Sequence, residues 1–429
     1  MMQYPAAGAV PSPANNMIGA AVLSTMLLAV AGLASPARAD PLTFDQAISR
    51  AQANAPSLRA RALGANASRA ARIAAGSLPD PKLALGVDSF PISGPLAFQP
   101  SRDNFTWVRV GISQDFPNPA KRRAQRTRAD ADIAVAEASA ALETRTVEVA
   151  TAIAWITLAY AQKRLSAVEA VRRKLDQLVR TTPSAVAAGN ARPGQTLAGR
   201  QSLAALDDRR DELNADVGRT RAALTRWTGD PAPQIAGPMP DFAIDEATLR
   251  ASINSNPLLG PSQARIAQAA ADVRLAEADR KSDFGVEASY QHRDPRFGDY
   301  VSAGVTVSLP FFTRRRQGAL IAAGQAEASR VDAEREAARR ELAANLEAGL
   351  ADHTMHHDQW MRSLRTLGPL ARERVDLETA SYGAGRATLV DVVDAHVALV
   401  EAALITLDRE ALVEIDGARL TLTYRSATR

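Results

Sequence analysis

The chain of 429 residues has no cysteine, and only 5% of its residues are aromatic. Without cysteine it cannot form disulfides, bind a metal through thiolates, use a thiol nucleophile or carry a lipid on an N-terminal cysteine. The motifs of common enzyme classes are also missing, since there is no HExxH zinc motif, no glycine-rich phosphate loop and no nucleophile elbow. The sequence therefore predicts a protein that is not an enzyme, needs no cofactor and has no lipid anchor.

Long runs of one charge are absent as well. The net charge is +4, and the arginines are interspersed with aspartate and glutamate along the chain. A dispersed pattern of this kind does not form the basic stripe typical of nucleic-acid-binding domains, so we expect no nucleic-acid partner. Two local basic segments, Lys121–Arg128 and Arg314–Arg316, stand where predicted strands pass into helices. We expect them just inside a membrane boundary.

Long hydrophobic runs are missing except for one stretch near the N-terminus. Residues Ile18–Leu33 are apolar, and Ala37-Arg38-Ala39 forms an A-x-A cleavage site before Asp40. The run is shorter than the roughly 20 residues that a membrane-spanning helix needs. It therefore predicts a cleavable secretory signal peptide over residues 1–39, although no basic residue precedes it from either Met1 or Met17. The alternative is an N-terminal membrane anchor.

The most informative feature that is present is an internal repeat. The motif LTFDQA at Leu42–Ala47 returns as FAIDEA at Phe242–Ala247, and a similar order of helices and strands follows each copy. We predict a first structural repeat over residues 40–232 and a second over 233–429, joined in one protomer. The predicted strands span 82–90, 105–116, 284–292 and 300–309, and the predicted long helices span 120–188, 195–227, 317–384 and 389–424.

The predicted strands alternate apolar and polar residues, as in Val301-Ser302-Ala303. Their length of about ten residues suits a tilted strand that crosses a bilayer. Four strands cannot close a barrel, and open edges in lipid are costly, so several chains must contribute to one barrel. A soluble sheet packed on one face is the alternative. The polar residues expected to line the barrel lumen are Arg109, Ser113, Glu287, Ser302 and Thr306.

The predicted long helices are too long for a globular core. A helix of about 65 residues extends on the order of 100 Å. Each is followed by a glycine-containing turn and a returning helix, which makes a helical hairpin. The last helix has the 4-3-4-3 apolar spacing of a coiled coil, in the ladder Val393, Val397, Val400, Leu404, Leu407 and Ala411.

The second hairpin turn leads into two aspartates, Asp391 and Asp394, which share one face of a helix. Carboxylates at a helix start interact favourably with its dipole, which is the simplest explanation for such a pair. The first repeat, however, has Gln195 and Ala198 at the matching positions. Starting the helix therefore does not require the pair.

Three local motifs, in this order and spacing, connect the chain to a known family. They are Leu78-Pro79-Asp80-Pro81 before the first strand, Gly304 and Pro310 at the last strand, and the segment Tyr382–Asp394 at the second hairpin turn. With the two-repeat plan, the mature chain resembles the TolC-like outer-membrane efflux proteins, and most closely their heavy-metal branch. The resemblance implies a mainly α-helical homotrimer with four transmembrane strands per chain, a shared twelve-stranded β-barrel and a periplasmic α-barrel tunnel.

The same resemblance assigns roles to residues at the second hairpin turn. Asp391 and Asp394 match two aspartates that form a gate and selectivity ring at the constriction of the tunnel. Tyr382 matches a residue that latches the closed tip. The arginine expected at position 387 is replaced by Ala387, with Arg386 one residue earlier, so the proposed latch is Tyr382 with Arg386.

The resemblance also implies a function and partners. It indicates a passive channel in the Gram-negative outer membrane, in contact with outer-membrane lipid, that completes a tripartite pump. Its partners would be a periplasmic adaptor protein and an inner-membrane RND-type transporter, and its substrates metal cations or drugs. Two alternatives stay open: the exit duct of an ATPase-driven type I secretion system, and a soluble periplasmic coiled-coil scaffold or adaptor.

One further cluster could bind a metal. His353, His356 and His357 lie at positions i, i+3 and i+4, a spacing that can direct two imidazoles to one ligand. The preferred interpretation is a polar cluster on a long helix. No other metal ligands are predicted.

Overall fold

The computed structural model describes residues 41–187 and 193–425. The predicted signal peptide over residues 1–39 and most of the first hairpin turn, at residues 188–192, lie outside the described residues. A compact unit of the chain begins at Pro41.

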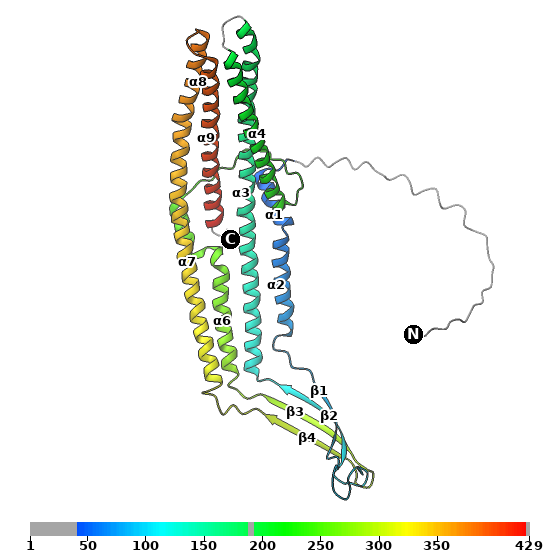
Figure 1. The fold of residues 1–429 in the computed structure, drawn as a ribbon. Coiled ribbons are helices and arrows are strands. Elements are labelled where there is room, and N and C mark those ends of the chain that lie inside the picture. Colours follow the sequence, from blue (N-terminus) through cyan, green and yellow to red (C-terminus); the bar gives the residue numbers. More distant parts are fainter. Residues whose placement is uncertain (1–40, 188–192, 426–429) are drawn as a thin grey trace, which may run out of the picture. The chain divides into compact units, whose positions relative to one another are not determined.

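The first half of the chain places two helices before a strand pair and a helical hairpin after it (Figure 1). Thr43 and Gln46 form a capping box that starts the first helix, because each side chain accepts a hydrogen bond from the other residue's backbone N–H. The elements are α1 (Phe44–Asn54), α2 (Pro56–Ala74), β1 (Lys82–Asp88), β2 (Trp107–Phe116), α3 (Pro119–Ala187) and α4 (Pro193–Thr228).

The second half follows the same order, with two short 3₁₀ turns added before its second helix. Asp245 caps the first helix here, accepting hydrogen bonds from the N–H groups of Ala247 and Thr248. The elements are α5 (Glu246–Ser252), η1 (Ile253–Ser255), η2 (Pro257–Leu259), α6 (Gly260–Ala278), β3 (Phe284–His292), β4 (Tyr300–Val307), α7 (Gln317–Arg362), η3 (Ser363–Leu367), α8 (Gly368–Gly383) and α9 (Leu389–Tyr424).

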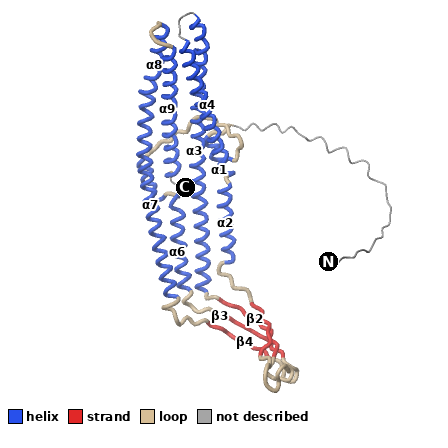
Figure 2. The backbone as a smooth tube through the Cα atoms, in the orientation of Figure 1, coloured by secondary structure: helices blue, strands red, loops and turns tan. Residues whose placement is uncertain are grey.

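The four strands form one antiparallel sheet in the order β1-β2-β3-β4. The central pair, β2 and β3, joins the two halves of the chain. Helices α2, α3, α6 and α7 pack side by side in the matching order, so the sheet continues into a layer of helices (Figure 2). The edge strands β1 and β4 have no partner on their outer sides among the described residues.

The strands lie where the alternation predicts them; β3 has the predicted bounds, and the other three are shorter. β1 ends at Asp88 and not at residue 90, because Ser89 takes a positive φ of 59° that breaks the extended backbone. β2 begins at Trp107, two residues later than predicted, and β4 ends at Val307, two residues earlier.

The change from sheet to helix is organised by Asn118, which is buried. Its side chain accepts a hydrogen bond from the N–H of Lys121 at 2.8 Å, and Pro119 occupies the first position of α3, as is typical of a helix start. The Asn118 side-chain amide donates to the carboxylate of Asp283 at 2.9 Å. One residue thereby starts a helix in the first half and connects it to the strand entry of the second half.

The core runs along the helices in successive apolar clusters. Its largest buried side chain is Trp155 of α3, which packs edge to face on Phe44 and donates a hydrogen bond to the carbonyl of Leu42 at 3.0 Å. Nearer the hairpin turns, the predicted ladder of α9 packs against Val168 and Leu175 of α3. None of the helices in residues 41–187 and 193–425 is both long and apolar enough to cross a membrane.

One prediction about the helices is wrong. The sequence predicts an unbroken helix over 317–384, whereas α7 passes into the π-helical turn η3 before α8. Pro369 has no N–H, and its ring would clash with the carbonyl four residues earlier, so the helix widens locally. Arg409 of α9 stabilises this widened turn by donating hydrogen bonds to the Gln359 carbonyl at 3.2 Å and to the Ser363 hydroxyl.

Candidate functional site

The sheet has one polar and one apolar face, and the five predicted lumen residues share the polar one. The register pairs Ser113 with Glu287, Ser289 with Ser302, and Gly285 with Thr306. Residues paired across neighbouring strands project to the same face, and every second residue along a strand does so too. Arg109, Ser113, Glu287, Ser302 and Thr306 therefore form one surface.

Side chains on this polar face are already partnered across strands. Arg109 forms a salt bridge with Asp88 at 3.0 Å, so its positive charge is offset by a neighbour. Ser302 accepts a hydrogen bond from the Gln291 amide at 3.1 Å. Glu287 lies over Gly304, where a Cβ atom would stand 2.8 Å from its carboxylate oxygen. Glycine at this position leaves room for the carboxylate on the polar face.

The opposite face of the sheet is apolar and exposed. Leu85 and Val305 are each 71% exposed, and the side chains of all four strands continue the pattern. A contiguous apolar surface of this kind marks contact with a membrane or another protein. Its further members are Leu83, Val87, Val108, Val110, Ile112, Phe284, Val286, Tyr290, Val301 and Val307.

The loops at the far end of the sheet are held together by Arg293, a residue that the sequence analysis does not single out. Its buried guanidinium donates hydrogen bonds to the Asn104 carbonyl of the β1–β2 loop and the Gly298 carbonyl of the β3–β4 loop, each at 2.9 Å. The same group stacks over the ring of Tyr300 at 4.1 Å. The only hint in the sequence is that an arginine follows directly on a strand end.

The second hairpin turn is built around Gly385, whose φ of +70° favours glycine. The N–H of Gly385 donates to the Tyr382 carbonyl at 3.0 Å, and the N–H of Arg386 donates to the Ser381 carbonyl at 2.8 Å. Thr388 then caps α9 in an extended conformation. These contacts place both predicted gate aspartates on the first turns of α9, exposed at the end of the hairpin.

The two aspartates have different environments. Asp391 completes a capping box, because its carboxylate accepts hydrogen bonds from the N–H and the hydroxyl of Thr388, each at 2.7 Å. These hydrogen bonds hold the pKa of Asp391 below its usual value, since they favour the charged form. Within one protomer, the helix-start explanation therefore accounts for the position of Asp391.

Asp394 instead faces a groove of about 520 Å³ between α4 and α9. Glu401 and Asp408 of α9 line the same groove at intervals of seven residues, which places the three carboxylates in a row. Arg209 of α4 lies on the other side of the groove. The groove is thus acidic along α9 and separates the two hairpins of the protomer.

The predicted latch residues also differ from each other. Tyr382 is half-buried against the apolar cluster that includes Leu389 and Val393. Arg386 is exposed and forms no ion pair with any residue that the structure describes. The two side chains therefore form no latch within a single protomer.

The histidine cluster does not converge on one point. The Nδ1 atom of His356 lies 2.7 Å from the carboxylate of Asp416 on α9, and both residues are largely buried. The ring of His357 packs edge to face on Trp360. His353 is half-buried, and burial lowers its pKa, against the opposing effect of Asp416. Across residues 41–187 and 193–425, no set of three or more histidines or acidic residues is arranged to hold a metal ion.

Part of the chain matches a known protein family. Residues 248–423 match the family described as outer membrane efflux protein. No individual curated protein matches the chain.

The fold resembles several solved channels over most of both chains. CusC has a TM-score of 0.74 at 14% identity, covering 89% of this chain and 91% of its own. The Campylobacter jejuni CmeC outer membrane channel gives 0.72 at 12% identity, with 90% and 87% covered. The open state of the Neisseria gonorrhoeae MtrE outer membrane channel gives 0.72 at 14%, with 89% and 88% covered. At these identities, the likeness establishes the fold.

The family match and the fold support the same conclusion. The matched segment runs from α5 to α9 and contains both predicted gate aspartates, while the fold likeness extends over the first half as well. Members of this family are passive outer-membrane channels and not enzymes. The chain thus resembles the outer membrane efflux proteins, through the family match over residues 248–423 and through its fold.

Proposed function

We propose that the chain is the outer-membrane channel of a tripartite efflux pump and conducts substrates passively from the periplasm to the outside. The observation that carries this proposal is the sheet, which exposes an apolar face and leaves β1 and β4 unpaired among the described residues. In lipid, the unpaired backbone groups would each cost several kcal/mol, so the edges must meet other strands. Joining β4 of one protomer to β1 of the next removes every edge.

In this proposal three protomers form a twelve-stranded barrel, as the family resemblance implies. The apolar face meets lipid, and the face with Arg109 and Glu287 lines the lumen. The helices continue as a periplasmic tunnel, with the repeats 40–232 and 233–429 contributing one hairpin each. A cleaved signal peptide over residues 1–39 directs export of the chain.

The experiment that tests this proposal is fractionation of cells that express the full chain. We expect a trimer in the outer membrane that resists dissociation until it is heated. A monomer in the soluble periplasmic fraction would refute the channel and favour the coiled-coil scaffold or adaptor.

We further propose that Asp391 and Asp394 form a ring of six carboxylates at the periplasmic end of the trimer. Both are exposed at the hairpin end, and crowded carboxylates in a narrow throat attract cations. Tyr382, packed on the apolar cluster of its own protomer, and the exposed Arg386 would latch the closed tip against a neighbouring chain.

The double substitution Asp391→Ala with Asp394→Ala tests the gate. We expect the trimer to fold and its single-channel conductance in planar bilayers to rise severalfold, because the charge ring is removed. Thr388→Val is the matched control, since it deletes the cap hydroxyl and keeps both carboxylates. It should weaken the helix start by about 1 kcal/mol without opening the channel. Unchanged conductance in the double variant would contradict the gate.

The proposed partners are a periplasmic adaptor and an inner-membrane RND-type transporter, which supply energy and most of the selectivity. The motif Leu78-Pro79-Asp80-Pro81 supports the heavy-metal branch, so metal cations are the first substrates to test and drugs the second. A deletion strain should become sensitive to zinc, cobalt, cadmium or copper. Loss of a secreted protein with no change in metal or drug sensitivity would favour the type I secretion duct.

A further inference from the structure

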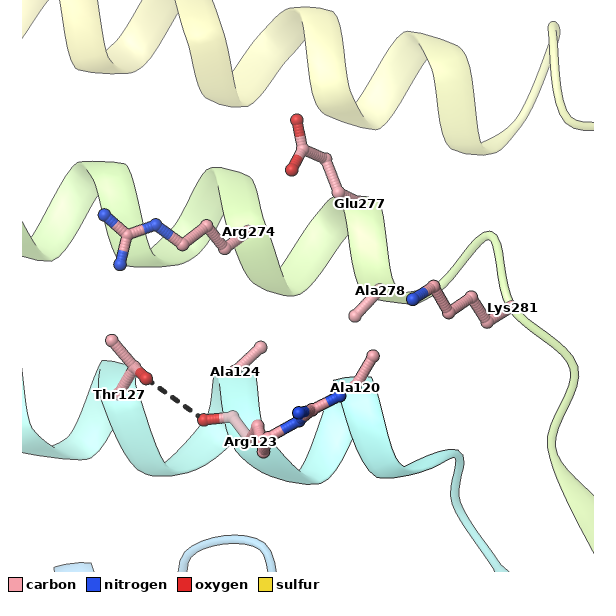
Figure 3. A pocket seen from close by; sticks show the side chains of 8 residues that line it. All are labelled: Ala120, Arg123, Ala124, Thr127, Arg274, Glu277, Ala278 and Lys281. Carbon is pink, nitrogen blue, oxygen red and sulfur yellow. Dashed lines mark hydrogen bonds between the residues drawn. The ribbon is translucent and has the colours of Figure 1, made fainter.

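A basic depression of about 330 Å³ lies between α3 and α6, next to the point where these helices meet the strands (Figure 3). Three cationic side chains line it: Arg123 from α3, and Arg274 and Lys281 from α6 and the turn that follows it. Glu277 is the one carboxylate in the lining, and Figure 3 shows it turned toward α7. The lining has a net positive charge.

Contacts of the neighbouring residues determine the side of the helix layer on which this depression opens. Lys121 forms salt bridges with Asp279 at 2.9 Å and with Asp283 at 3.6 Å. Asp283 directly precedes β3, and its carbonyl accepts a hydrogen bond from the N–H of Ser308 at 2.9 Å, which continues the pairing of β3 with β4. It therefore lies on the same face as Glu287, the polar face of the sheet. Arg123, two residues after Lys121, lies about 200° further around α3. It therefore projects to the apolar side.

The basic residues contributed by α6 and the turn after it lie on the same side of the helix layer as Arg123. Asp272 and Asp279 are seven residues apart and bind Arg128 and Lys121, so they mark the polar side of this helix. Arg274, two residues after Asp272, lies about 200° further around α6 and therefore on its opposite side. Lys281 follows the end of α6 at Ala278 and lines the same depression as Arg123 and Arg274. The depression therefore opens on the side of the helix layer that continues the apolar face of the sheet.

These cations are not neutralised within the protomer. Nearby basic residues on the polar side, such as Arg128, are engaged in ion pairs. Arg123, Arg274 and Lys281 are exposed, and none forms an ion pair with any residue in the described ranges. The exposed Phe311 and Phe312 lie in the segment between β4 and α7, where another strand passes into a helix. Unpaired cations and exposed aromatic side chains at the level where strands pass into helices are typical of a membrane interface.

We propose that this depression, the α3–α6 basic pocket, binds the phosphate of an anionic phospholipid in the periplasmic leaflet of the outer membrane. The proposal rests on the proposed membrane-spanning role of the strands. Acyl chains would cover the apolar strand face while the headgroup phosphate contacts the two guanidinium groups and the ammonium group. Arginine suits this role because its planar donors match phosphate oxygens.

The test compares full-length trimers in mixed micelles that contain phosphatidylglycerol or phosphatidylcholine with the same acyl chains. Bound lipid is titrated by native mass spectrometry. The wild type should prefer phosphatidylglycerol. Each removed cation should reduce the affinity roughly fivefold, and the triple variant R123Q/R274Q/K281Q should lose on the order of a hundredfold. If the triple variant does not fold, the single variant K281Q replaces it in the titration, with the roughly fivefold loss of affinity expected for one removed cation.

Arg265→Gln is the matched control, because Arg265 is an exposed arginine of α6 seven residues before Asp272, on the polar side. It should keep the wild-type preference. The proposal is overturned if the triple variant binds phosphatidylglycerol like the wild type, if R265Q loses as much, or if millimolar inorganic phosphate displaces the lipid and identifies a free-anion site.

Bilayer conductance separates this proposal from the channel function. Wild-type channels that conduct but show no preference for phosphatidylglycerol would remove the lipid site and leave the channel intact. Wild-type protein that never enters bilayers would refute the channel and the lipid site together.

Discussion

The sheet and the helical bundle use the same apolar residues in opposite ways. In α9, Val393 is 1% exposed and Leu404 6% exposed, because α3 and α4 cover them. In the strands, Leu85 and Val305 are each 71% exposed. The helices therefore satisfy their apolar pattern within one protomer, whereas the strands do not. The difference indicates that the missing partner of the sheet lies outside the chain.

The largest expected loss of stability comes from substituting a buried apolar residue of the helical bundle. Leu404→Ala should destabilise the helical bundle by about 2–5 kcal/mol, because it leaves a cavity in a packed seam. Chemical denaturation followed by circular dichroism measures the change. Ile405→Ala, at the neighbouring position that is 42% exposed, should cost much less. Equal losses at the two positions would mean that the seam is not packed as described.

A charged side chain introduced on the exposed apolar face of the sheet tests whether lipid covers that face. Val305→Arg should cost about 2–4 kcal/mol if the apolar face meets lipid at the depth of the bilayer centre. The neighbouring substitution Thr306→Arg projects to the polar face and should be tolerated. The yield of heat-modifiable trimer in the outer membrane is the measurement. Similar yields for both variants would show that lipid does not cover this face.

The smallest effect concerns a titratable group in the bundle. Because burial lowers the pKa of His353, the unfolded chain binds a proton more readily than the folded chain. Stability should therefore be highest above the unfolded pKa near 6.5 and should fall, by less than about 1 kcal/mol, as the pH drops below it. His353→Gln should flatten this dependence in denaturation curves recorded from pH 7.5 to 5.5. If stability depends on pH in His353→Gln as it does in the wild type, burial of His353 is not the cause.

Much of this protein follows from its sequence. The period-two alternation of apolar and polar residues predicted all four strands and assigned their residues to the correct face of the sheet. This works because strands pair through their backbones, so the two faces of the sheet differ only in the side chains they carry. The heptad ladder of α9 predicted a packed seam, and its members are buried or half-buried. The family resemblance is confirmed by the match over residues 248–423.

Other features depend on contacts between distant segments and could not be predicted. At the π-helical turn Ser363–Leu367, Arg409 of another helix donates hydrogen bonds to the Gln359 carbonyl and the Ser363 hydroxyl. The different environments of Asp391 and Asp394 arise because one bonds to Thr388 and the other faces α4. The spacing of the two aspartates in the sequence does not distinguish these environments.

The sequence by itself determined the periodicities, and with them the strands, the hairpins and the family, because period and turn chemistry are local properties. Only the tertiary structure decided which apolar residues are covered, which cations are paired and which side of the helix layer they occupy. Those properties depend on neighbours that are distant in sequence. The α3–α6 basic pocket illustrates this, since Arg123 and Arg274 come from different halves of the chain and line one pocket because α3 packs against α6.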